Sequence, residues 1–119
     1  MQKKQLLVVG SFALILICTI FIMSAIIGAT IPPEDMTRTR QMVLEVRIGD
    51  FFEQKGVLPS SLLDLPKVEG KDNSTKDGWG REMLYLTNGN VVLLRSYGCD
   101  GKVGGVGKDT DLEIKFTLQ

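Results

Sequence analysis

The chain opens with a long apolar run and continues with a segment whose apolar residues recur at helical spacing. The run from Leu6 to Ile31 contains no charged residue, and Lys3 and Lys4 precede it. About 20 residues of helix are enough to cross the apolar core of a bilayer, and positively charged flanks remain cytoplasmic. We therefore expect residues 1–31 to form a cytoplasmic tip and a transmembrane anchor, with residues 32–119 forming one globular domain on the other side.

Three kinds of processing compete with this interpretation of the apolar run. A signal peptidase cut after Ala29 would place the bulky Ile27 where a small residue is preferred, and the run is longer than usual. A lipoprotein anchor at Cys18 would need a small residue in place of Ile17. A prepilin-type leader would end at Gly10. An intact membrane anchor is the interpretation that the residues favour.

From Asp35 to Lys55 the apolar residues follow one helical face. This pattern predicts a helix that Gly56 ends, because glycine tolerates the left-handed backbone found there. Pro32-Pro33 marks either the start of this helix or a bend in a longer one. The expected core residues on the helix are Leu44, Ile48, Phe51 and Phe52. Their expected partners are Val92, Leu94, Ile114 and Phe116.

Three short segments near the C-terminus have the composition and alternation of β-strands. Met83–Leu86 and Val91–Arg95 flank Asn88-Gly89, a sequence typical of a tight hairpin. The segment from Leu112 to Gln119 alternates apolar and polar residues, as a half-buried strand does. The predicted fold class is therefore α+β, with a helix packed on a small antiparallel sheet of about three strands.

Composition excludes several kinds of function. Lys and Arg together number 14, as do Asp and Glu, so no basic surface for nucleic acid is expected. The protein has no histidine, the commonest general base and transition-metal ligand. Cys99 has no cysteine or histidine near it in the sequence, and Cys18 lies within the apolar run. We expect no enzyme, no small-molecule substrate and no zinc site.

The segment from Ser96 to Asp111 is the one candidate for chemistry. It contains five glycines, which free the backbone to curl, and the carboxylates Asp100, Asp109 and Asp111. Carboxylates gathered by such a curl repel one another unless a cation lies among them. Oxygen ligands at flexible distances suit Ca²⁺ better than Zn²⁺ or Mg²⁺. A surface turn rich in Asp and Gly explains the same residues equally well.

Several motifs occur in an order that resembles a known family. The segment Gly56–Ser60 reads G-x-LP-S, and Asp77–Gly80 reads D-x-WG, followed by Tyr85-Leu86. Residues Ser96–Asp111 read S-x-G-x-DG-x-x-GG-x-G-x-D-x-D. This series is similar to the major pseudopilin of type II secretion, which builds a short periplasmic filament.

The resemblance implies a type IV pilin-like fold, in which the transmembrane helix continues into the amphipathic one. It also implies that the loop after the central hairpin binds calcium. The ligands carried over to this sequence are the carbonyl of Tyr97 and the side chains of Asp100, Asp109 and Asp111. Where some members offer another oxygen-bearing side chain, this sequence has Gly107.

The resemblance further implies a single-pass protein of the bacterial inner membrane, with its C-terminal domain in the periplasm. Its partners would be membrane lipid and other pseudopilin or secretion-system subunits, in a homo-oligomer or filament. The N-terminus departs from the family, because Ser11 follows Gly10 and Ile15 stands where a glutamate is expected. An uncleaved, membrane-tethered calcium-binding module that scaffolds or binds exported partners is the alternative function.

Overall fold

A computed structural model describes residues 14–20, 22 and 30–119. The protein divides into two compact units, Met1–Thr30 and Ile31–Gln119. Residues 14–20 and 22 of the predicted membrane anchor are helical and residues 30 and 31 are not, whereas residues 6–13, 21 and 23–29 lie outside the described residues. Within the described ranges, no helix combines the length and the apolar content that a bilayer crossing requires. The anchor therefore stays a prediction.

Helix α2 (Pro33–Lys55) confirms the predicted helix and begins two residues before its expected start. Pro33 occupies the first helical position, where the missing N–H of proline costs nothing, and residues 30–32 are not helical. The helix ends at Gly56, which adopts a left-handed backbone (φ 71°) and donates its N–H to the carbonyl of Phe52 at 2.7 Å. The proline pair is therefore the start of α2 and not a bend in a longer helix. The expectation that the transmembrane helix continues into the amphipathic one was wrong at residues 30–32, because a proline inside a helix removes a backbone hydrogen bond.

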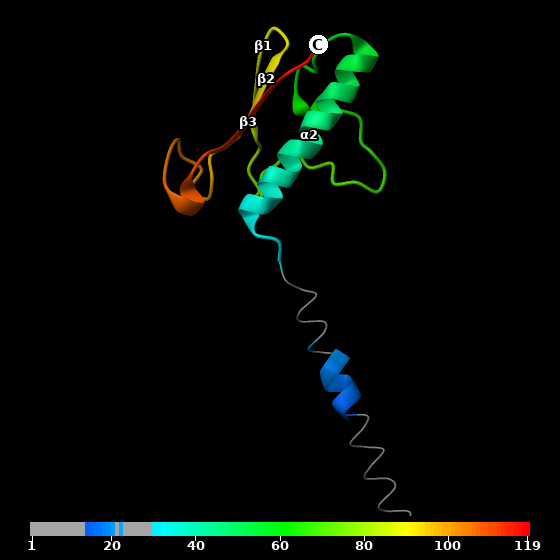
Figure 1. The fold of residues 1–119 in the computed structure, drawn as a ribbon, viewed down its shortest axis with the longest axis vertical. Coiled ribbons are helices and arrows are strands. Elements are labelled where there is room, and N and C mark those ends of the chain that lie inside the picture. The colour runs from blue at the N-terminus through cyan, green and yellow to red at the C-terminus, as the bar shows by residue number, and fades with distance from the viewer. Residues whose placement is uncertain (1–13, 21, 23–29) are drawn as a thin grey trace, which may run out of the picture. The chain divides into compact units, whose positions relative to one another are not determined.

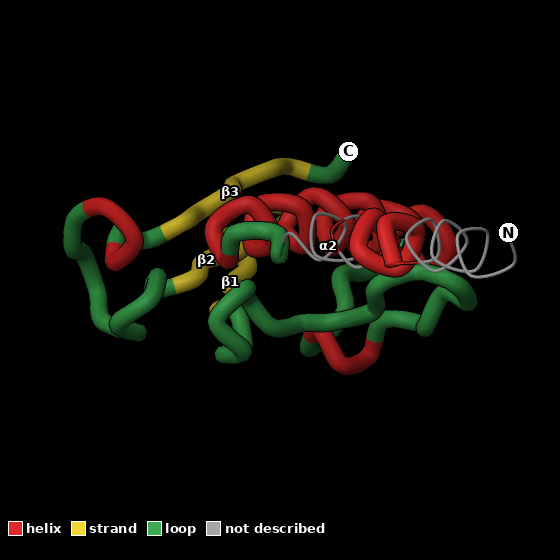
Figure 2. Tube along the Cα trace, turned by 90° about the horizontal axis from the view of Figure 1, so that it is seen from below, coloured by secondary structure: helices red, strands yellow, loops and turns green. Residues whose placement is uncertain are grey.

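A three-stranded antiparallel sheet confirms the predicted fold class. Its strands are β1 (Leu84–Asn88), β2 (Val91–Ser96) and β3 (Leu112–Thr117), in the order β1-β2-β3. Pairing between β2 and β3 runs from Val91 opposite Thr117 to Ser96 opposite Leu112. The sheet lies along one side of α2, whereas the β2–β3 loop projects away from the helix in both views (Figures 1 and 2).

The hairpin between β1 and β2 turns one residue later than the Asn88-Gly89 signal predicts. Asn88 is still paired with Val91, so the two turn residues are Gly89 and Asn90. Gly89 has a positive φ of 58° and Asn90 does not. A positive φ at the first turn residue alone is the pattern of a type II′ turn, which requires glycine there. This shift also moves β1 forward from the predicted Met83–Leu86.

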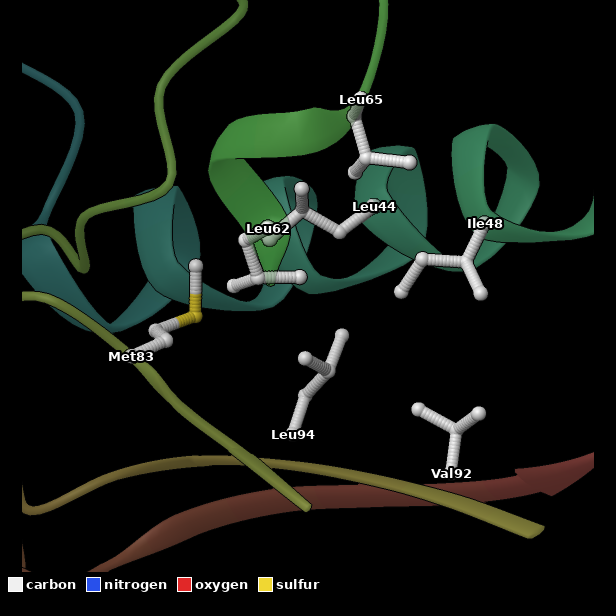
Figure 3. Close-up of a cluster of buried hydrophobic side chains, with 7 residues drawn as sticks. All are labelled: Leu44, Ile48, Leu62, Leu65, Met83, Val92 and Leu94. Atoms are coloured by element: carbon white, nitrogen blue, oxygen red, sulfur yellow. The ribbon is translucent and has the colours of Figure 1, made fainter. Parts of the chain in front are cut away.

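The core forms where α2 faces β2 (Figure 3). Leu44 and Ile48 of the helix and Val92 and Leu94 of the sheet are fully buried. They form one cluster with three residues from the connecting segments: Leu62, Leu65 and Met83. Partly buried residues that pack against this cluster include Phe51, Ile114 and Phe116, as predicted.

Phe52 is the one predicted core residue of the helix that does not pack against the cluster. Its side chain is half-buried and lies outside the set of residues in contact with the core. At 3.6 residues per turn, Phe52 lies about 80° around the helix from Leu44, whereas Phe51 lies about 20° away. The assignment of Phe52 to the core was wrong because the buried face is narrower than the apolar stripe.

The connection from α2 to the sheet carries a short 3₁₀ helix, η1 (Leu62–Asp64). Ser61 caps it, accepting from the N–H of Leu63 at 3.0 Å while the Asp64 carboxylate accepts from the N–H of Ser61 at 3.0 Å. Further along, Asn73 closes the exposed connector by accepting from Val68 N–H and donating to its carbonyl. These side-chain bonds replace regular secondary structure over a long stretch of the sequence.

Candidate metal loop and the buried network behind it

The loop between β2 and β3 wraps around the backbone of Asp109, which belongs to a 3₁₀ turn, η2 (Gly107–Asp109). The loop has a first arm, which leaves β2, and a second arm, which leads into β3. A hydrogen bond from the N–H of Cys99 to the carbonyl of Lys108 (2.9 Å) joins the two arms. A Cβ atom at Gly98 would lie 2.7 Å from the Asp109 carbonyl oxygen, and one at Gly105 would lie 2.5 Å from it. Both glycines also have positive φ angles, so this wrapping requires glycine at both places.

The three predicted carboxylate ligands share this loop but do not form a cluster. Asp100 accepts a hydrogen bond from the N–H of Lys102 (3.0 Å), and Asp111 accepts one from the N–H of Gly104 (3.1 Å). Asp109 is half-buried, as is Tyr97, whose carbonyl is the fourth predicted ligand. Among the residues that the structure describes, no three Asp, Glu, Cys or His side chains lie close enough to hold a metal ion.

The donor set of this loop nevertheless matches a hard cation. All its candidate side-chain ligands are carboxylates, which supply the oxygen atoms that Ca²⁺ prefers. Asp100 and Asp111 each use only one carboxylate oxygen in their loop hydrogen bonds, so the second oxygen of each remains available. The residues present therefore fit calcium chemically, and calcium binding stays a prediction.

Arg81 was not among the predicted site residues, yet its side chain forms hydrogen bonds with the first arm of the loop. Its Nη1 donates to the carbonyl oxygens of Gly98 and Cys99, both at 3.0 Å. Gly101 lies directly against the guanidinium, since a Cβ there would fall 2.7 Å from Arg81 Nε. The guanidinium thus supplies a positive charge beside the acidic loop and occupies two carbonyls that could otherwise serve as ligands.

A buried carboxylate ties the D-x-WG motif to the start of the loop. Asp77 is 1% exposed, and its Oδ2 accepts from Ser96 Oγ at 2.6 Å. Its Oδ1 accepts from the N–H groups of Trp79 (3.0 Å) and Arg81 (2.9 Å). Ser96 Oγ in turn accepts from the N–H of Gly98 at 3.3 Å. These bonds satisfy a carboxylate whose burial would otherwise be costly.

The first turns of α2 hold the same motif and both strands that lead into the loop. Thr37 Oγ1 donates to the Pro33 carbonyl (2.7 Å) and accepts from the N–H of Gly78 (2.8 Å). Gln41 Nε2 donates to the carbonyl of Leu112 (2.8 Å), at the start of β3, and more weakly to that of Leu94 in β2 (3.4 Å). Both ends of the loop are therefore fixed to the helix through buried polar groups.

The polar residues of this network were absent from the sequence-based expectations. Thr37 and Gln41 are buried on α2 among apolar residues, so helical periodicity gave no reason to single them out. Asp77 belonged to a motif that was noted, but a lone aspartate before a glycine is more typical of an exposed turn. Gly78 lies against the first turn of α2, since a Cβ there would fall 2.0 Å from the Pro33 carbonyl oxygen, but the sequence alone does not show that this position needs glycine.

Comparison with known proteins identifies no relative for this protein. No protein-family model matches it, and neither a curated protein nor a solved structure does. The class of protein is therefore defined by its architecture, an α+β domain with one long helix on a three-stranded antiparallel sheet.

Proposed function

We propose that this protein is a non-enzymatic, pseudopilin-like structural component of a type II secretion system or a related periplasmic filament. In this proposal residues 1–31 anchor it in the bacterial inner membrane, and the C-terminal domain carries a calcium-stabilised loop. The observation that carries the proposal is the β2–β3 loop, which holds three carboxylates between two strand ends fixed to one long helix. A loop with fixed ends is suited to be ordered by a cation without change elsewhere in the domain.

The residues that would hold the ion are the carboxylates of Asp100, Asp109 and Asp111 and the carbonyl of Tyr97. Calcium would supply positive charge between these carboxylates and join the two arms of the loop. Arg81 already neutralises part of this charge from the first arm. The protein's own contribution is to hold the strand ends in place, so that the ion has to order only the loop between them.

The experiment is a thermal melt of the full-length protein in mild detergent, with chelator, with calcium or with magnesium. Extracellular calcium sites typically bind at about 10⁻⁴–10⁻³ M, so millimolar calcium should stabilise the domain by about 1–2 kcal/mol. Magnesium should do much less, because it gives up its water reluctantly. Asp100→Ala should abolish the calcium increment, whereas the exposed Asp50→Ala should retain it. If the melting temperature were the same with chelator, calcium and magnesium, the calcium proposal would be refuted and the loop would be an ordinary surface turn.

A second candidate function is the uncleaved calcium-binding module that binds exported partners at the membrane. Ile15 favours it, because the filament family places a glutamate there that helps to set subunit register. Mass spectrometry of the mature N-terminus, on protein from its native membrane, separates the two. We expect the full-length protein, which fits an uncleaved relative of the filament family as well as the tethered module, whereas a protein that begins at Ser11 would exclude the uncleaved module and favour the filament subunit.

A further inference from the structure

Arg47 is a buried arginine that lacks a carboxylate partner. Its side chain lies on α2 and is 8% exposed. Its Nη2 donates to the carbonyl of Pro66 at 3.0 Å and its Nη1 to that of Asn73 at 3.5 Å, while its Nε is buried with no hydrogen-bond partner. Within the described ranges the ion pairs are Arg40–Asp72 and Arg95–Glu113, so neither includes this guanidinium.

The carboxylates near this guanidinium are engaged elsewhere or exposed. Asp72 pairs with Arg40 at 2.8 Å, and Glu82 accepts the hydroxyl hydrogen of Thr75 at 2.7 Å. Asp50, about one turn along α2, is exposed to solvent. Asp72 lies close enough to interact with the charge of Arg47, but it is exposed and its direct partner is Arg40. Burial of an arginine without a direct carboxylate partner is costly, and protein carbonyls offset only part of that cost. The guanidinium therefore retains both charge and unused N–H groups.

A hollow of about 210 Å³ borders this arginine, between η1 and the connector. Its wall includes Lys67 and Lys76, and two carboxylates accept hydrogen bonds from other wall residues: Asp72 from the N–H of Ser74 (2.9 Å) and Glu82 from Thr75 Oγ1 (2.7 Å). Three leucines supply the apolar part of the wall: Leu62, Leu63 and Leu65. Arg47, Lys67 and Lys76 outnumber these two carboxylates, so the hollow has a net positive charge that attracts a small anion. Its apolar walls favour an anion that carries a hydrocarbon group.

We propose that this hollow, the Arg47 pocket, binds a carboxylate that carries a short apolar group. A guanidinium presents a planar fork of N–H donors that matches the two oxygens of a carboxylate. The leucines would cover the apolar group, and the two lysines would raise the local concentration of anions. The carboxylate belongs either to a free short-chain acid or to the C-terminal residue of another protein. None of the β2–β3 loop residues lines the pocket, so this inference is independent of the calcium proposal.

The test is an NMR titration of the full-length protein in mild detergent, observing the arginine Nε–H groups. The Arg47 resonance is identified by its loss in Arg47→Lys. Isovalerate represents a free acid and N-acetyl-leucine the C-terminal residue of a protein, while isoamyl alcohol and inorganic phosphate are the controls. We expect a saturable shift of the Arg47 Nε–H resonance with the carboxylates and none with the alcohol. Tighter binding of one carboxylate identifies the source.

Arg47 also donates to the carbonyls of Pro66 and Asn73, so a change of Arg47 itself could disturb the fold. Variants of the two exposed lysines test the binding of anions without this effect on folding. Lys67→Gln and Lys76→Gln should each weaken carboxylate binding by about two- to fivefold, as expected for an exposed charge. Lys102→Gln, in the β2–β3 loop, is the matched control and should leave binding unchanged. If neither isovalerate nor N-acetyl-leucine produced a saturable shift, the proposal would be overturned. Equal binding of phosphate would overturn the assignment to carboxylates.

Discussion

Ser96→Ala is the sharpest test of the buried network behind the β2–β3 loop. Ser96 is 1% exposed and donates to the Asp77 carboxylate at 2.6 Å, so the change removes a hydrogen bond to a buried charge. Such a bond contributes about 1.5–3 kcal/mol, and Gly98 N–H also loses its acceptor. We expect the free energy of unfolding to fall by about 2–4 kcal/mol, a large share of the total for a small domain.

The assay is urea and thermal unfolding of the full-length protein in mild detergent, followed by far-ultraviolet circular dichroism. The expected loss corresponds to a fall in Tm on the order of 10–25 °C for a domain of this size. Ser60→Ala, at an exposed position, is the control and should change stability by less than about 0.5 kcal/mol. If Ser96→Ala behaved like this control, the network would contribute no net stability and our reasoning would be refuted.

Four further substitutions test other parts of the structure. Ile48→Ala should cost about 2–5 kcal/mol in denaturant unfolding, and Phe52→Ala less than half as much; equal costs would return Phe52 to the core. Gly78→Ala should destabilise by about 2–4 kcal/mol, because its Cβ would meet a helix carbonyl oxygen at 2.0 Å; a silent change would contradict this contact. Hydrogen bonding by Arg40 lowers the pKa of Asp72 from 3.8, so this pair stabilises the fold above that pH and its contribution is lost as the pH falls below it. Asp72→Asn should therefore flatten the acid limb of a stability–pH profile, and an unchanged limb would show that the pair contributes nothing.

The elements of the fold were predictable because each has a local cause in the sequence. Apolar spacing marked α2, Gly56 marked its end, and alternation marked β3. The errors arose where the local signal was ambiguous. Asn88-Gly89 predicted a hairpin correctly, but it did not indicate which pair of residues forms the turn. Phe52 lies at the edge of the apolar face of α2, and how much of that face is buried depends on how the sheet packs against it.

The candidate site was predictable only in part, for a different reason. The glycines and aspartates of the β2–β3 loop lie close together in the sequence, so composition found them. Asp77 and Arg81 reach the loop from a distant segment, and a single sequence does not reveal such contacts. Likewise, Arg47 sits among the polar residues of an amphipathic helix, where an arginine usually faces solvent.

The hydrogen bonds of Gln41 have a mechanical consequence. Any pull on the residues before Pro33 enters the domain through the first turns of α2. Because Gln41 bonds to carbonyls of both β2 and β3, the load passes from the helix into two strands at once. Thr37 adds a parallel attachment through Gly78. Separating the first turns of the helix from the sheet therefore breaks bonds to both strands, and tension along the backbone is shared between them.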